Sequence, residues 1–238
     1  MTDTAAPPTE PQQAFELACH QVGFDLIQPL QVGWYNQAVG EANRIDDLGS
    51  THHQAILVGN TRALWTKFLQ AFQNDPTLQA TADPLNAYTE RSLANACQVL
   101  SGEFRIYFSH SHSEPVVAMQ QLAHLSGLAH LSPSHLNVHP DYGPWIALRA
   151  VVVTKQPGPT EPRTAPIPCQ NCDHDCVQAF EKAVALDPPA TGHHGSTAHW
   201  RAWLAVRDAC PTGRTWRYSD QQIEYHYTHN RRVLLTDT

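Results

Sequence analysis

The chain has 238 residues, of which 42% are hydrophobic and 16% charged, and its formal net charge is -7. This composition is typical of a globular protein with one large or two small domains, and it excludes a disordered chain. Only 15 residues are Lys or Arg, which argues against a general affinity for nucleic-acid phosphates. No apolar run approaches the roughly 20 residues of a membrane span. The N-terminus lacks the basic and apolar blocks of a signal peptide, so a cytoplasmic location is expected.

The predicted elements mix helices and strands without a regular β-α-β alternation. In the first half they are a disordered tail over residues 1–11, a helix over 12–20, an extended segment over 24–35 with an edge or bend at Pro29, a buried strand over 55–59, a helix capped by Thr61, and a helix from Pro84 towards Leu100. The second half adds a strand over 103–109, a helix from Pro115 to about Leu131, a strand over 145–153, proline-rich loops over 156–168 and 188–195, and helices over 176–186, 197–209 and 220–227. This order favours an α+β fold over a doubly wound one.

A single arginine interrupts an apolar, strand-forming run that follows a turn rich in Pro and Gly. The turn covers residues 139–144, and Arg149 lies inside the apolar run over 145–153. A guanidinium within a buried strand costs free energy unless an anion or another acceptor pairs with it. Two interpretations stay open: an anion-binding arginine in a pocket, or an arginine on the open face of an edge strand.

Two other segments place polar residues at helical spacing. Gln120, His124 and Gly127 share one helix face, and the missing side chain at Gly127 would let a flat ligand approach closely. A half-exposed helix with a hydrogen-bonded histidine explains the same pattern. Arg201 lies between two tryptophans on an amphipathic helix, which indicates either an anion site or a packing helix whose arginine is solvated.

The cysteines form the third pattern. Cys169, Cys172 and Cys176 have the spacing C-x2-C-x3-C, and Cys210 precedes a proline. Closely spaced thiols in a chain without a signal peptide favour a metal or redox role over disulfides. A Cys-Pro pair often ends an iron–sulfur ligand set, and zinc is equally compatible with these ligands. The alternative to a metal or redox site is a set of free thiols in a mobile surface loop. The 15 histidines include no H-E-x-x-H motif, and most are expected in loops.

The ordered set of segments resembles the cobalamin-processing proteins of the CblC type over residues 13–235. The residues that carry the resemblance are Gln31-Val32-Gly33-Trp34-Tyr35-Asn36, Asp83-Pro84, Ala123-His124, His139-Pro140, Arg149, His174-Asp175-Cys176-Val177, His199-Trp200-Arg201 and Arg217-Tyr218-Ser219. The resemblance implies a flavin-reductase or nitroreductase-like α+β fold with a mixed sheet flanked by helices. Its domains would be a cobalamin- and flavin-binding region over 12–155, a Pro- and Cys-rich loop with a short helix over 156–195, and C-terminal helices over 196–238 that complete the pocket.

The resemblance further implies an enzyme that binds cobalamin and removes its upper axial ligand. A thiol such as glutathione would take an alkyl group, and reduced FMN or FAD would drive removal of cyanide. Arg149 and Arg201 match the arginines that hold the carboxylates of glutathione. The positions expected to bind the corrin or a cofactor are Met119, Gln120, His124, Gly127, Gly143, Trp145, Leu148, Tyr218 and Arg232.

The cysteine segment departs from the animal members of that family and is similar to the cluster region of bacterial iron–sulfur relatives. It implies a [4Fe–4S] cluster or zinc at Cys169, Cys172, Cys176 and Cys210. The alternatives are therefore an iron–sulfur reductase or electron carrier with another substrate, and a B12 carrier without turnover. The expected partners are a corrinoid, a second copy in a homodimer, and downstream B12 enzymes, but neither nucleic acid nor a membrane.

Overall fold

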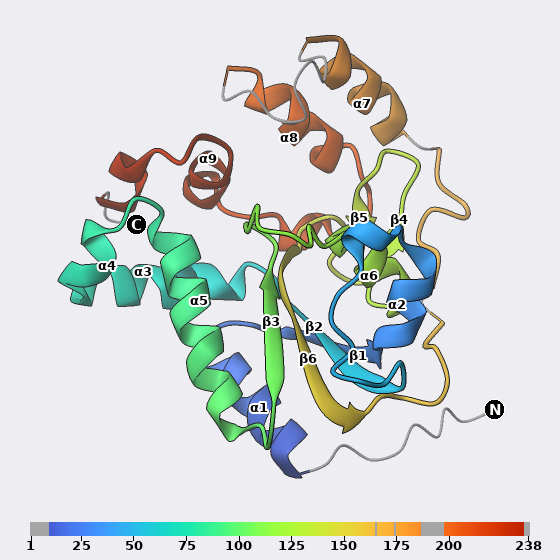
Figure 1. Cartoon of the computed structure of the whole chain (residues 1–238). Coiled ribbons are helices and arrows are strands. Elements are labelled where there is room, and N and C mark those ends of the chain that lie inside the picture. The colour runs from blue at the N-terminus through green and yellow to red at the C-terminus, as the bar shows by residue number, and fades with distance from the viewer. Residues whose placement is uncertain (1–9, 165, 174, 187–197, 236–238) are drawn as a thin grey trace. The chain divides into compact units, whose positions relative to one another are not determined.

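Two structural units are built from alternating stretches of the chain. The computed structural model describes residues 10–164, 166–173, 175–186 and 198–235 (Figure 1). The first unit comprises residues 1–129 and 147–165, and the second comprises 130–146 and 166–238. Among the described residues, no helix has the length and apolar character needed to cross a membrane.

Four antiparallel strands form the sheet of the first unit. They are β1 (Leu26–Gln31), β2 (His53–Asn60), β6 (Ala147–Pro157) and β3 (Phe104–Phe108), in that spatial order. Every pairing between neighbours is antiparallel, so the expected mixed sheet is wrong. Strands β2 and β3 run in the same direction, because helices connect them. They form no parallel pair, because β6 lies between them. Pro29 lies on the edge strand β1, which confirms the expectation from the sequence. Proline has no backbone N–H, so it suits a strand with a neighbour on one side only.

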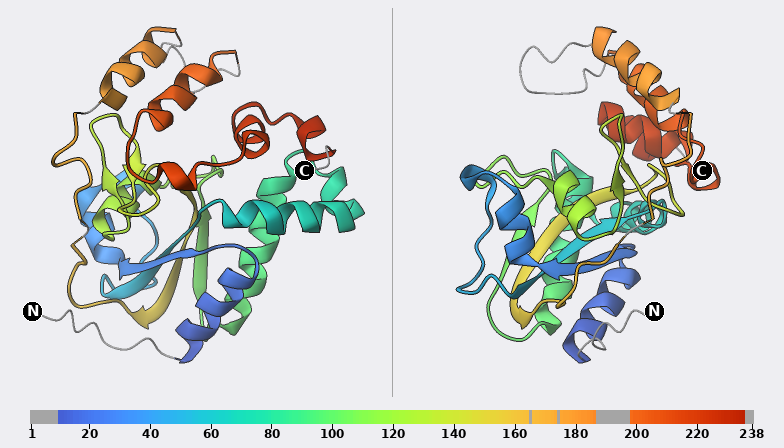
Figure 2. Two further views of the ribbon diagram at one scale, coloured as in Figure 1. Left: turned by 180° about the vertical axis from the view of Figure 1, so that it is seen from behind. Right: turned by 90° about the vertical axis from the view of Figure 1, so that its right-hand side faces the viewer.

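The helices of the first unit flank this sheet (Figures 1 and 2). They are α1 (Glu10–Gln21), α2 (Val32–Ala38), α3 (Ala63–Asn74), α4 (Pro76–Ala80), α5 (Pro84–Ala96) and α6 (Met119–Leu125), with 3-10 turns at Glu41–Asn43 and Cys97–Val99. Asp83 caps α5 as its sequence predicts, because its carboxylate accepts from Asn86 N–H and Pro84 follows directly. The core includes the two interior strands β2 and β6, whose residues 55–58 and 150–153 are buried.

Two predicted elements of the first unit have different limits. The extended segment over 24–35 ends at Gln31, and α2 begins at Val32. Gly33 donates its N–H to the Thr51 carbonyl at 2.9 Å, a contact from a distant segment that local sequence does not reveal. The tail expected over 1–11 is described only at its last two residues, which belong to α1. Thr61 lies one residue before the N-cap of α3 and accepts from Ala63 N–H at 3.3 Å.

The helix predicted over 115–131 is much shorter than expected. It spans only Met119–Leu125, and the chain then turns at Gly127, whose φ is +72°. A Cβ atom at Gly127 would overlap the Arg163 carbonyl. Glycine therefore ends the helix there, because it adopts a left-handed conformation and allows a close approach of another backbone segment.

The second unit combines a short hairpin with helices. Strands β4 (His130–Leu131) and β5 (Asn137–Val138) pair antiparallel, and the helices are α7 (Asp175–Leu186), α8 (Trp200–Asp208) and α9 (Asp220–Thr228), with 3-10 turns at Arg214–Trp216 and Arg231–Leu235. Helices α7 and α8 lie side by side and bury Cys176, Ala183 and Val206 between them (Figure 2). The predicted loop at 188–195, with His193 and His194, lies outside the described residues, as does His174.

Candidate functional site

Arg149 lies at a β-bulge on an interior strand of the first unit. Val58 pairs with Ala150 and Gly59 pairs with Leu148, so Arg149 is the extra residue of β6. Its carbonyl accepts from Ser109 N–H at 2.9 Å. A bulge changes the direction of a side chain within a sheet, which explains why a charged residue can follow an apolar pattern on this strand.

The guanidinium of Arg149 is buried and hydrogen-bonded. Arg149 is 8% exposed, and its Nε donates to Asn60 Oδ1 at 2.6 Å. Asn60 Nδ2 donates to the Thr61 carbonyl at 2.6 Å, and Thr61 N–H donates to Asp25 Oδ1 at 2.7 Å. The interpretation as an exposed arginine of an edge strand is therefore wrong. Because Asn60 is a neutral acceptor, this hydrogen bond orients the guanidinium without neutralising its charge.

Replacing Asn60 tests this positioning. Asn60→Ala removes the acceptor of a buried charged donor, so we expect the free energy of unfolding to fall by about 1–3 kcal/mol. Asn74→Ala is the control, since Asn74 is exposed at the end of α3 and surface changes usually stay within about 0.5 kcal/mol. Urea denaturation measures both. Equal midpoints and slopes for the two variants and the parent chain would contradict the role of Asn60.

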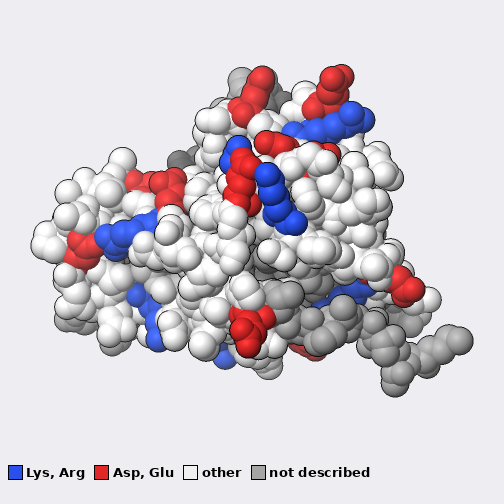
Figure 3. Space-filling model, turned by 60° about the horizontal axis from the view of Figure 1, so that its bottom comes forward, with Lys and Arg blue, Asp and Glu red and all other residues white. Residues whose placement is uncertain are grey.

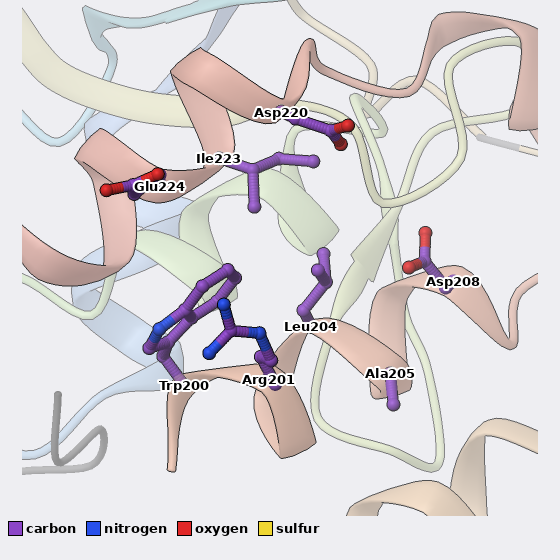
Figure 4. Close-up of a pocket in the computed structure, with 8 residues that line it drawn as sticks. All are labelled: Trp200, Arg201, Leu204, Ala205, Asp208, Asp220, Ile223 and Glu224. Atoms are coloured by element: carbon purple, nitrogen blue, oxygen red, sulfur yellow. The ribbon is translucent and has the colours of Figure 1, made fainter. Parts of the chain in front are cut away.

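A pocket of about 510 Å³ lies between α8 and α9 in the second unit (Figure 4). Apolar and charged side chains line it together: Trp200, Arg201, Leu204, Ala205, Asp208, Asp220, Ile223 and Glu224. Trp200 and Arg201 project from the first turn of α8, and Ile223 faces them from α9 (Figure 4). This combination of apolar and charged side chains suits a small molecule that itself carries charged groups.

Most of the acidic charge around this pocket is already paired. Arg217 donates from Nε to Asp208 Oδ1 and from Nη1 to Asp220 Oδ1, both at 2.8 Å. These hydrogen bonds raise the pKa of Arg217 above its usual value. The guanidinium carbon of Arg201 lies 4.4 Å from the centroid of the Trp200 ring. In the described part of the chain no carboxylate forms an ion pair with Arg201. Arg201 is therefore a cation available to an anionic ligand.

Several other surface cations are paired with nearby carboxylates. On the face drawn in Figure 3, Lys and Arg are interspersed with Asp and Glu, and most of the surface is neither. Arg105 and Lys155 both contact Glu103, at 2.6 and 3.0 Å. Arg91 contacts Asp75, whose pKa falls below its usual range because the Thr77 hydroxyl and Arg91 bond to its carboxylate. This local pairing distinguishes these residues from Arg201.

A second aromatic cluster in this unit contains Trp145 and Tyr218. The two rings are 5.6 Å apart in an edge arrangement. Arg207 and Arg217 lie over the Trp145 ring, 6.0 and 5.6 Å from its centroid. Trp145 is 1% exposed, so its indole is covered by these neighbours. The structure thus brings together two of the residues predicted to bind a cofactor, and it gives both a packing role.

The remaining predicted ligand-binding positions are distributed over both units. Gln120 and His124 are exposed on α6, while Met119 of the same helix is buried. Leu148 is partly buried opposite Gly59. Arg232 is exposed in the 3-10 turn Arg231–Leu235 of the second unit. Arg149 belongs to the first unit and Arg201 to the second. Contact of these residues with a corrin stays a prediction.

The four clustered cysteines all belong to the second unit. Cys176 lies in the first turn of α7 and Cys210 follows α8, and both are buried. Cys169 and Cys172 are half-buried in the preceding turn, where Cys172 N–H donates to the Cys169 carbonyl at 3.4 Å. Burial raises the pKa of Cys169 to about 11, and the other three thiols add to this rise. Within the described ranges, no three His, Cys, Asp or Glu side chains are placed to hold a metal ion as they stand.

Sequence reasoning missed Asn60, which orients Arg149, and residues that line or border the pocket of Arg201. Asn60, Glu224 and the pairing of Arg217 with two carboxylates were not predicted. Asn60 follows directly after the predicted strand over 55–59, and a polar residue at the end of a buried strand is a signal that could have identified it. The pairing of Arg217 depends on the approach of α8 and α9, which no local pattern encodes.

Comparison with known proteins agrees with the predicted family. A family model described as the methylmalonic aciduria and homocystinuria type C family matches residues 23–235. The chain belongs to this family. Among the relatives of the type C family, the cyanocobalamin reductase / alkylcobalamin dealkylase of Homo sapiens is 29% identical, with 92% of this chain and 78% of the relative aligned. The protein of the same name from Danio rerio is 31% identical, with 90% and 87% aligned.

A solved structure has a fold similar to that of this chain. The B12-trafficking protein CblC of C. elegans superposes with a TM-score of 0.71 at 21% identity, and 94% of each chain is covered. At this identity the likeness concerns the fold, and it confirms an α+β architecture shared over nearly the whole chain.

Proposed function

We propose that the chain binds cobalamin and removes its upper axial ligand, by thiol-dependent dealkylation or by reductive decyanation. The relatives named cyanocobalamin reductase / alkylcobalamin dealkylase support this activity, because they align over 90–92% of the chain at 28–31% identity. The observation within the structure that supports it is Arg201, a cation held over Trp200 in a pocket large enough for a tripeptide-sized ligand.

In dealkylation, Arg201 holds a carboxylate of glutathione. A guanidinium donates two parallel hydrogen bonds to a carboxylate, and a nearby positive charge favours a thiolate over a thiol. The thiolate attacks the carbon bound to cobalt and forms a thioether. The electron pair of the broken cobalt–carbon bond stays on the metal, so Co(III) becomes Co(I). Arg149, the other arginine predicted to bind a carboxylate of glutathione, is oriented by Asn60.

In decyanation, a reduced flavin, FMN or FAD, supplies the electrons that weaken the axial bond of cyanocobalamin. The flavin needs a cation for its phosphate, and Arg201 is the residue of the α8–α9 pocket that fits this need. The same residue would then serve glutathione or flavin, but not both at once. Excess glutathione should therefore slow flavin-dependent decyanation.

The corrin is supported by the exposed face of α6, where Gln120 and His124 lie. Met119, Gly127 and Leu148 in the first unit, and Gly143, Trp145, Tyr218 and Arg232 in the second, complete the proposed binding set. A relation of the fold to flavin reductases and nitroreductases, a cytoplasmic location, a homodimer, and delivery to downstream B12 enzymes belong to the same proposal.

The experiment combines the purified full chain with methylcobalamin and glutathione under anaerobic conditions, and separately with cyanocobalamin and reduced FMN. We expect the corrin absorption spectrum to change to that of a reduced cobalamin, with S-methylglutathione as the product of the first reaction. Binding of both cobalamins with unchanged spectra would identify a carrier. No heat of binding to either cobalamin would overturn the proposal in favour of a reductase with another substrate.

A further inference from the structure

The α8–α9 pocket contains a second uncompensated charge besides that of Arg201. Its lining includes three carboxylates, those of Asp208, Asp220 and Glu224. Arg217 binds the first two of these, each at 2.8 Å. In the described part of the chain, neither Arg201 nor Glu224 forms an ion pair, with each other or with another residue. One cation and one anion of the pocket are therefore left for a ligand, which need not break an existing ion pair to bind them.

A neutral donor holds the carboxylate of Glu224 in place. Asn230 Nδ2 donates to Glu224 Oε1 at 3.2 Å. Asn230 is fixed in turn, because its N–H donates to Thr228 Oγ1 and its Oδ1 accepts from Arg232 N–H. Glu224 is half-buried, and among the described residues no donor bonds to its second oxygen, Oε2. The amide of Asn230 thus orients this carboxylate without neutralising its charge.

Aromatic and apolar packing places Arg201 and Glu224 on facing helices. Trp200, the neighbour of Arg201 on α8, stacks on Tyr227 of α9 with ring centroids 5.7 Å apart. Tyr227 follows Glu224 by three positions, so these two residues are neighbours on the surface of α9. Trp200 also packs against the buried cluster that contains Ile223. Arg201 and Glu224 therefore line one pocket from opposite helices (Figure 4).

We propose that Glu224 binds the α-ammonium group of glutathione while Arg201 binds the carboxylate on the same carbon atom of its γ-glutamyl end. Glu224 is then a specificity-determining residue for the thiol. An α-amino acid group has both charges on one carbon, which matches a pocket that offers one guanidinium and one carboxylate. The ammonium supplies donors for Oε2 of Glu224, and the guanidinium pairs with the ligand's carboxylate. This inference rests on the proposed function, because it concerns the thiol that Arg201 binds there.

A ligand with anionic groups alone suits this pocket less well. The two arginines at the pocket, Arg201 and Arg217, face three carboxylates, so the surroundings are net negative. Glu224 repels a second anionic group beside Arg201, because like charges brought together cost free energy. Of the two ligands proposed for Arg201, glutathione carries an ammonium group and FMN does not. The charge of Glu224 therefore favours glutathione.

The test compares glutathione with glutaryl-cysteinylglycine, which keeps the thiol and both carboxylates and lacks only the α-amino group. Calorimetry with the cobalamin-free full chain gives the affinity for each thiol, and initial rates with saturating methylcobalamin give kcat/KM. We expect the parent chain to prefer glutathione about 10-fold, because a hydrogen bond between charged groups contributes about tenfold or more to an equilibrium constant. Glu224→Gln should abolish this preference by weakening the binding of glutathione, and it should not weaken the binding of the analogue.

The substitution is conservative, and the chain offers a matched control. The amide oxygen of Glu224→Gln can still accept from Asn230, so the variant should fold, and an unchanged midpoint of urea unfolding checks this. Glu181→Gln removes an exposed carboxylate of α7 that does not line the pocket. This control should prefer glutathione as strongly as the parent chain does.

Two results would overturn the role of Glu224. One is an equal affinity of the parent chain for the two thiols, and the other is a preference for glutathione that persists in Glu224→Gln. If methylcobalamin is still dealkylated in either case, the proposed function stands without this contact. If calorimetry shows the preference and its loss but no dealkylation occurs, the ammonium site stands and the proposed function fails. A parent chain that binds neither thiol contradicts both.

Discussion

Arg201→Ala should lower the kcat/KM of glutathione-dependent dealkylation by about 30–100-fold, which corresponds to about 2–3 kcal/mol of lost charge-assisted hydrogen bonding. The side chain is a cation in the α8–α9 pocket whose guanidinium lies over Trp200. Among the described residues that line this pocket, Arg201 is the one basic side chain, and nearby Arg217 is already paired with Asp208 and Asp220, so no other lining residue can replace the charge of Arg201. Initial rates at varied glutathione concentration, with methylcobalamin saturating, measure the loss.

Two further variants separate charge from geometry and from general damage. Arg201→Lys keeps the charge but loses the planar pair of donors, so it should recover only part of the rate. Arg214→Ala is the control, because Arg214 is exposed in the 3-10 turn Arg214–Trp216 and does not line the pocket. It should retain the parent rate.

The affinity for cobalamin distinguishes a thiol clamp from a corrin contact. Calorimetry should give the same dissociation constant for methylcobalamin in Arg201→Ala and in the parent chain. If affinity for the corrin falls as far as the rate does, Arg201 does not act as a glutathione clamp. A KM for glutathione that stays constant while kcat falls would also contradict the assignment, since a binding contact should affect KM.

The predictability of the site differs between its parts for a physical reason. Arg149 could be found from sequence because a guanidinium in an apolar strand is conspicuous, and the strand is indeed interior. Its bulge arises from the register of β6 against β2, a strand about 90 residues away in the chain that also supplies the acceptor Asn60. Neither segment alone encodes the register between distant strands. The availability of Arg201 depends in the same way on the approach of α8 and α9, which supply Asp208 and Asp220 as the partners of Arg217.

The fold was predictable where local signals agree with packing. The start of α5 follows from Asp83-Pro84, and α7 and α9 have nearly the expected limits. The helix predicted over 115–131 failed because its apolar spacing continues past Gly127, while the backbone there adopts φ +72° against Arg163. Tertiary contact overrides local propensity at such a point.

Gly143 provides the sharpest test of a predicted ligand residue that the structure explains by packing. Gly143 closes the turn after His139, and the two residues exchange backbone hydrogen bonds of 2.9 Å in each direction. Its φ is +58°, and that of Gly213 is +70°. A Cβ atom on Gly143 would overlap the Thr212 carbonyl, and one on Gly213 would overlap the carbonyl of Tyr142. The backbone segments around Gly143 and Gly213 therefore cross at a distance that only glycine at both positions permits.

Gly143→Ala should lower the free energy of unfolding by about 2–5 kcal/mol, since the left-handed conformation costs about 1–2 kcal/mol and overpacking adds about 1–3 kcal/mol. Gly213→Ala should be equally damaging. Gly102→Ala is the control for conformation alone, because φ is +85° there and no atom lies within 4 Å of the added Cβ, so it should lose only about 1–2 kcal/mol. Thermal and urea unfolding without any ligand measure these differences.

If Gly143→Ala unfolds like Gly102→Ala but loses affinity for cobalamin, then Gly143 contacts the corrin, and the crossing of the two backbone segments does not require glycine at this position. A large loss of stability in the ligand-free chain instead means that the sequence retains glycine here to let the two segments pass, whatever binds nearby.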